Sequence, residues 1–139
     1  MQMANVSRSG LADIARRQGD YTHALALYPR VIHVWRLIDQ RGAIARCLEC
    51  MGFIAQEPTS DAPKPQNLLR RAATLYGAAE TIRQTNNTPM SPWEQPEYDG
   101  HVDALRRMLN PTELAAAWQA GQRMVLDQAV AYATRERAV

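Results

Sequence analysis

A two-residue connection between two helical patterns restricts the fold of this chain more than any other feature of its sequence. Apolar residues recur at helical spacing on both sides of the pair Gly19–Asp20. Glycine takes the left-handed conformation that ends a helix, and an aspartate can accept hydrogen bonds from the first amides of the next helix. Because the connection is so short, the two helices must run antiparallel and bury their apolar faces against each other. The sequence therefore predicts a helical hairpin at its start.

The same helical periodicity continues along the chain, and no stretch has the alternating pattern of a β-strand. Pro29 falls inside the second helical stretch and predicts a kink there, or a full break. Asn110, which precedes a proline, is expected to cap the sixth helix, and Gly121 is expected to end it. The predicted fold class is all-α, with antiparallel hairpins and about seven helices, over residues 4–17, 21–38, 41–56, 66–84, 96–109, 112–120 and 127–137.

Small residues recur in a way that indicates an internal repeat. Ala12 and Ala24 of the first hairpin correspond to Gly52 and Ala72 of a second one, and such residues allow helix backbones to approach closely. A chain of 139 residues is long enough for one domain with its own core. We expect a single domain, 1–139, in three parts: the first repeat and the start of the second at 1–56, a Pro-rich loop at 57–65, and the rest of the second repeat with C-terminal capping helices at 66–139.

The large–small pair Leu11–Ala12, the turn Gly19-Asp20-Tyr21, and then Ala24 and Tyr28 resemble the signature of the tetratricopeptide repeat (TPR). The segments at 70–83 and 96–133 look like the C-terminal end of large bacterial TPR regulators, which combine an ATPase with a LuxR-type, cyclase-like or winged-helix region. The resemblance implies an α–α superhelix that senses, oligomerises or recruits. The sequence contains no Gly-x-x-x-x-Gly-Lys-Ser/Thr segment, so both a free-standing module and a truncated remnant of such a regulator fit.

In TPR arrays the first helices of successive repeats line a concave face that binds a protein or peptide. The resemblance places the following residues on that face: Val6, Ser9, Asp13, Arg16, Arg17, Arg46, Glu49, Phe53, Gln56 and Glu57. Arg16 and Arg17 could clamp a carboxylate, and Phe53 could serve as an apolar anchor. An extended peptide or a partner helix would suit so short a groove, and a plain solvated face is the alternative. The end hairpin could also be covered by a second copy in a homodimer.

Two clusters contain metal-binding residue types. Cys47 and Cys50 are three positions apart on a predicted helix, but a structural zinc site needs four ligands and the sequence has no second cysteine pair. Asp99, His101 and Asp103 could form a divalent-metal or acid–base site, although acidic residues near a helix start also complement the helix dipole. Packing is the expected role of the cysteines. We expect no metal and no cofactor, with a small metal- or ligand-binding helical protein as the alternative.

The sequence lacks the signature motifs of several classes of protein. There is no Gly-x-Ser-x-Gly or Gly-x-Gly-x-x-Gly motif, which argues against an enzyme of those classes. The formal charge of +2 is spread without a basic block, which argues against direct nucleic-acid binding. No apolar run is long enough for a membrane span or a signal peptide, so we expect no membrane association, a cytoplasmic location and reduced cysteines. The sequence thus favours a non-enzymatic module for protein–protein contact or oligomerisation.

Overall fold

The computed structural model describes the backbone of residues 2–57 and 65–135 and the side chains of residues 10–57 and 65–134. Within these ranges the chain is helical, without a strand, which confirms the all-α prediction and the expected number of elements. The helices are α1 (Gln2–Arg17), α2 (Tyr21–Leu37), α3 (Arg41–Gln56), α4 (Gln66–Asn86), α5 (Gln95–Met108), α6 (Pro111–Gln122) and α7 (Leu126–Arg135). Most of the predicted Pro-rich loop, and the last two residues of the predicted seventh helix, lie outside the described residues.

The predicted capping residues form the predicted contacts. Gly19 ends α1 with a φ of +81°, and the Asp20 carboxylate accepts a hydrogen bond of 3.3 Å from the backbone N–H of His23. The Asn110 side chain accepts hydrogen bonds from the backbone N–H groups of Thr112 and Glu113 at the start of α6. These contacts satisfy amides that a helix leaves without an internal partner, which is why the helices begin at these positions.

Two local expectations need correction. α2 continues through Pro29, so the alternative of a full break is wrong. Tyr28 and Ile32 are buried on either side of the proline, and this packing offsets the lost backbone hydrogen bond.

Gly121 does not end α6 but lies buried inside it. A Cβ atom at Gly121 would lie 2.8 Å from the backbone nitrogen of Ala78 on α4, so the glycine permits a close helix crossing.

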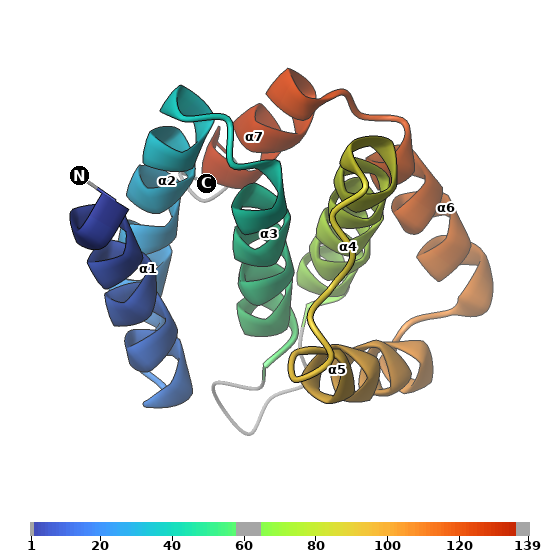
Figure 1. Ribbon diagram of the computed structural model, residues 1–139. Helices are drawn as coiled ribbons and strands as arrows, with labels where there is room; N and C mark the ends of the chain where they lie inside the picture. Colours follow the sequence, from blue (N-terminus) through green and yellow to red (C-terminus); the bar gives the residue numbers. More distant parts are fainter. Residues whose placement is uncertain (1, 58–64, 136–139) are drawn as a thin grey trace.

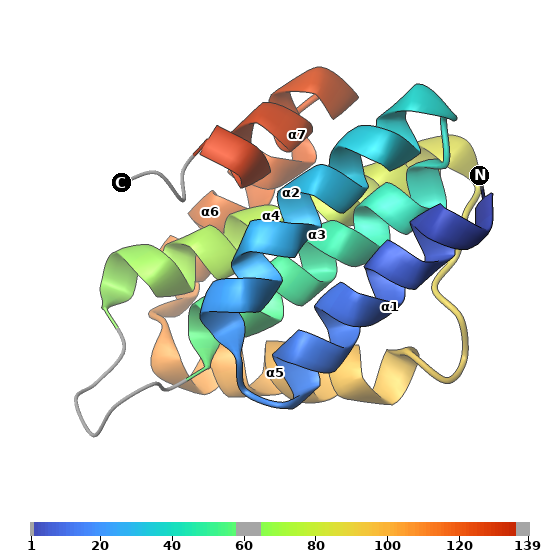
Figure 2. The same cartoon turned by 90° about the vertical axis from the view of Figure 1, so that its left-hand side faces the viewer.

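The helices pack as two antiparallel hairpins, α1–α2 and α3–α4, followed by three further helices (Figure 1). The most extensive contacts join α3 to α4 and α4 to α6, while α1–α2 and α2–α3 pack less extensively. α5 lies across one end of the hairpins, and α7 lies beside α2 (Figure 2). No helix in the described part of the chain is long and apolar enough to cross a membrane.

Small side chains bring the helices of each hairpin together. Ala12, Ala24 and Ala72 are fully buried, as the repeat pattern predicted. Gly52 on α3 faces the ring of Tyr76 on α4. A Cβ atom added at Gly52 would lie within 3.0 Å of three carbon atoms of that ring. In the core, the helices of each hairpin therefore approach each other closely at small residues, and the larger buried rings fill the space beside them.

Candidate functional site

α5 covers much of the face of α1 and α3 that the sequence assigned to a partner. Glu97 on α5 accepts hydrogen bonds from the guanidinium groups of three arginines on that face. The nitrogen–oxygen distances are 2.9 Å to Arg16, 3.3 Å to Arg46 and 3.4 Å to Arg17. Asp13 binds Arg16 and Arg17 as well, at 2.7 Å and 2.9 Å. The chain itself thus supplies the carboxylates for the arginines that were expected to clamp a partner.

The charge of Glu97 is stabilised by this arrangement. Burial raises the pKa of Glu97, but the hydrogen bond from Arg16 and the charges of Arg16 and Arg17 outweigh it, so the pKa lies below its usual value. The same balance, with burial opposed by the two arginines, lowers the pKa of Asp13. Both carboxylates therefore stay ionised at neutral pH. Glu97 joins α5 to arginines of α1 and α3, whereas Asp13 pairs with the arginines of its own helix.

Phe53, the expected apolar anchor, is fully buried, and it lines a small hollow of about 330 Å³ that Arg16 and Arg17 also line. Its ring stacks on His101 with the ring centroids 4.0 Å apart. Gln56 and Glu49 are buried too, so they cannot line an open groove. Gln56 donates a hydrogen bond to the carbonyl of His101 and accepts one from the Tyr76 hydroxyl, and Glu49 forms an ion pair with Arg83 at 2.7 Å.

Of the remaining predicted site residues, Glu57 lines the same small hollow of about 330 Å³ together with Arg16, Arg17 and residues of α5. Glu57 lies 2.9 Å from Nε2 of His101, whose Nδ1 donates to the backbone carbonyl of Glu97. The side chains of Val6 and Ser9 lie outside the described residues. The sequence did not indicate that α5 would occupy this face, because nothing in its local pattern says where it packs.

The structure does not bring the acidic metal candidates together. Asp99 accepts a hydrogen bond from Gln95, Asp103 is paired with Arg106, and both ring nitrogens of His101 already have partners. Across residues 10–57 and 65–134, no cluster of three or more histidine, cysteine, aspartate or glutamate side chains has the geometry to hold a metal ion. A divalent site at Asp99, His101 and Asp103 is therefore contradicted.

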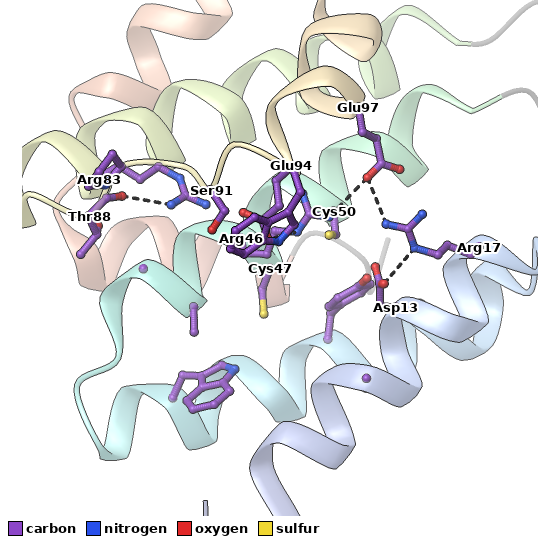
Figure 3. A pocket seen from close by; sticks show the side chains of 17 residues that line it. Asp13, Arg17, Arg46, Cys47, Cys50, Arg83, Thr88, Ser91, Glu94 and Glu97 are labelled. Carbon is purple, nitrogen blue, oxygen red and sulfur yellow. Dashed lines mark hydrogen bonds and ion pairs between the residues drawn. The ribbon is translucent and has the colours of Figure 1, made fainter. Parts of the chain in front are cut away.

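Beside the covered face, a hollow of about 650 Å³ lies between α1, α2, α3 and the segment that leads into α5 (Figure 3). Trp93 on that segment is 80% exposed. Three arginines and three carboxylates balance each other in the wall. The charged, aromatic and thiol side chains that line the hollow are those of Asp13, Arg17, Tyr28, Trp35, Arg46, Cys47, Cys50, Arg83, Trp93, Glu94 and Glu97.

The two cysteines lie in the α3 wall of this hollow and are both buried. Burial raises the pKa of each thiol, that of Cys47 well above its usual value. The positive charges of Arg46 and Arg16 oppose this effect at Cys50. The Tyr28 hydroxyl lies close to the Cys50 sulfur without the geometry of a full hydrogen bond. In the metal-free protein the thiols are accordingly protonated at neutral pH, which makes them poor nucleophiles.

No protein-family model matches this sequence, and neither a curated protein nor a solved structure was found to match it.

The hollow itself was not predicted from the sequence. Its wall is assembled from α1, α2, α3, the end of α4 and the segment before α5, and no sequence periodicity connects such distant positions. Trp93, which follows a proline, was a local signal that could have pointed to it, because a tryptophan in a proline-containing segment between helices has no helical face on which to be buried.

Proposed function

We propose that this protein is a non-enzymatic, TPR-like interaction module that binds a protein partner through the hollow. The composition of the wall carries the proposal: it contains two tryptophans, one tyrosine and three arginines. These are the residue types in which the binding energy of protein interfaces is concentrated. Trp93 is exposed over most of its surface, and a large exposed indole beside a hollow is a typical anchor for a partner.

The state of the reactive side chains supports a binding role over catalysis. The thiols of Cys47 and Cys50 are buried and protonated, and His101 is held between a carbonyl and a carboxylate while stacked on Phe53. A general base or nucleophile needs access to a substrate and a pKa suited to its task. The two thiols are packed in the core instead, and His101 is held by hydrogen bonds and ring stacking.

The balanced charge of the wall suits a partner segment that is close to neutral. A strongly anionic or cationic segment would meet as many repulsive as attractive groups in the hollow. Because α5 covers the adjoining part of α1 and α3, the open surface has room for only a short segment, either an extended peptide or one face of a helix.

A selection experiment tests this proposal. Peptides selected from a displayed library against the purified protein would be measured by fluorescence polarisation against wild type, Trp93→Ala, Arg17→Ala and the control Arg30→Ala. Arg30 is exposed on α2 and does not line the hollow. We expect Trp93→Ala to weaken binding roughly tenfold or more, and Arg30→Ala to leave it unchanged. Failure to select any binder, or binders that ignore both hollow variants, would refute the proposal.

A second copy of the chain is the alternative partner, favoured by one observation. Leu11 and Ile14 lie three positions apart on α1 and are 53% and 52% exposed, so the end hairpin presents an uncovered apolar pair. In this view the protein is a homodimer, or a remnant of a larger bacterial regulator in which a preceding repeat would cover α1. Sedimentation velocity should reveal a concentration-dependent dimer that the double variant Leu11→Asp/Ile14→Asp abolishes. A wild-type monomer at all concentrations would exclude the dimer.

A further inference from the structure

Two thiols form a pair on one face of α3, in the wall of the hollow. Cys47 and Cys50 are 4% and 2% exposed and form no disulfide (Figure 3). Side chains three positions apart on a helix are neighbours, with their Cβ atoms about 5–6 Å apart. Because a metal–thiolate bond is about 2.3 Å long, rotation of the two side chains can bring both sulfur atoms to a single ion.

Three residues that interact with Cys50 carry buried hydrogen-bond donors without a partner. Within the described side chains, the Tyr28 hydroxyl, Nε of Arg16 and Nη1 of Arg46 are buried and donate to nothing. Tyr28 is 3% and Arg16 is 6% exposed, so bulk water does not compensate them. All three side chains act on Cys50: the two arginines through their charge and Tyr28 through its nearby hydroxyl. In the metal-free protein burial outweighs these contributions and raises the pKa of the Cys50 thiol, but the donors and positive charge favour a thiolate once a cation binds to the sulfur atom.

We propose that Cys47 and Cys50 form a binding site for one soft monovalent cation, Cu(I) or Ag(I), held between two thiolates. Thiolates select soft metal ions, and these two ions are satisfied by two sulfur ligands in a line. Zinc, in contrast, takes four ligands, and the described residues offer no third ligand beside the pair. The number of ligands present therefore matches a two-coordinate ion.

Binding redistributes charge in a way that the wall can accommodate. Each thiol releases its proton to the buffer as its sulfur binds the ion, so two thiolates and one monovalent cation leave a single negative charge. Arg46 and Arg16 offset that charge, and the Tyr28 hydroxyl can donate to the Cys50 sulfur. The site goes beyond the proposed partner binding, since it uses the α3 wall and depends neither on Trp93 nor on a second protein.

A retention assay tests the site with the metal alone. The reduced protein would be mixed with excess Ag(I) in chloride-free buffer, passed through a desalting column and analysed for silver by mass spectrometry. We expect one silver ion per wild-type chain and none in Cys47→Ser or Cys50→Ser. Met108→Leu, which removes a partly exposed thioether away from the hollow, should retain the ion like wild type. A parallel anaerobic sample with Cu(I) should behave alike, and Zn(II) should not be retained.

A variant that keeps both sulfur ligands tests the role of the surrounding donors. Tyr28→Phe should bind Ag(I) about threefold to tenfold more weakly in a competition titration, because it lacks only the hydroxyl. Circular dichroism would establish whether each variant is folded. If a serine variant does not fold, the Ag(I) titration of Tyr28→Phe tests the proposed site in its place. The proposal is overturned if wild type retains no silver, if the double serine variant retains as much as wild type, or if Tyr28→Phe binds as tightly as wild type.

Discussion

The crossing of α4 and α6 makes a quantitative prediction about Gly121. A methyl group at this position would lie 2.8 Å from the backbone nitrogen of Ala78 and 2.9 Å from the carbonyl carbon of Thr74, and closer still to the oxygen of that carbonyl. The crossing is reciprocal, because a Cβ at Gly77 on α4 would lie 2.9 Å from the carbonyl carbon of Trp118 on α6. Backbone atoms cannot rotate away, so α6 would have to move as a unit.

The expected cost of Gly121→Ala follows from two opposing contributions. Forcing extra atoms into a packed interior costs about 1–3 kcal/mol, and we expect the upper end because the obstructing atoms belong to the backbone. Alanine favours a helix over glycine by about 1 kcal/mol. The free energy of unfolding should therefore fall by about 2 kcal/mol, which lowers the midpoint of urea unfolding by roughly 1 M.

The matched control is Gly100→Ala in α5, where an added Cβ meets nothing within 4 Å. This variant has the same gain in helix preference without the obstruction, so it should be more stable than wild type by about 0.5–1 kcal/mol. Urea unfolding followed by circular dichroism measures both variants. If Gly121→Ala unfolds at the same urea concentration as Gly100→Ala, the close crossing of α4 and α6 is refuted.

Two further predictions concern the α5 interface. Glu97→Gln should lower the free energy of unfolding at pH 7 by about 1–3 kcal/mol, as measured in urea, whereas Asp99→Asn should change it little. Because the pKa of Glu97 in the folded protein lies below its ordinary value of 4.5, its contribution is present above that pH and is lost as the pH falls through the lower folded value. Wild type and Glu97→Gln should therefore converge in acid, and a difference that stays constant while Glu97 becomes protonated would contradict this. Phe53→Ala should cost about 3–5 kcal/mol in thermal and urea unfolding, and a cost below 1 kcal/mol would mean that α5 does not pack on this ring.

The helices could be predicted from the sequence because the information that defines them is local. Gly19, Asp20 and Asn110 act on the turns next to them, and apolar periodicity marks the buried face of each helix. Gly121 shows where local information ends. A glycine near the end of an apolar pattern can either terminate the helix or permit a close crossing, and only the position of α4 decides between the two.

The candidate site could be predicted only in part, for the same reason. Arg16, Arg17 and Arg46 lie on neighbouring helices, as the repeat pattern suggested, but their partner Glu97 is about eighty residues from the first two. In the sequence, Glu97 was only one acidic residue near a helix start. Its contacts depend on where the α4–α5 connection places α5, and that placement results from tertiary packing of rings such as Phe53 and His101.

The position of α5 has a consequence for ligand selectivity. A tethered group competes at an effective concentration on the order of millimolar, so Glu97 is a permanent internal competitor for the arginines that it contacts. A free acidic molecule of equal intrinsic affinity, present at micromolar concentration, would occupy these arginines only about one time in a thousand. Glu97 therefore makes these arginines poor sites for a free acidic molecule, and in the proposed function recognition falls to the aromatic side chains of the hollow.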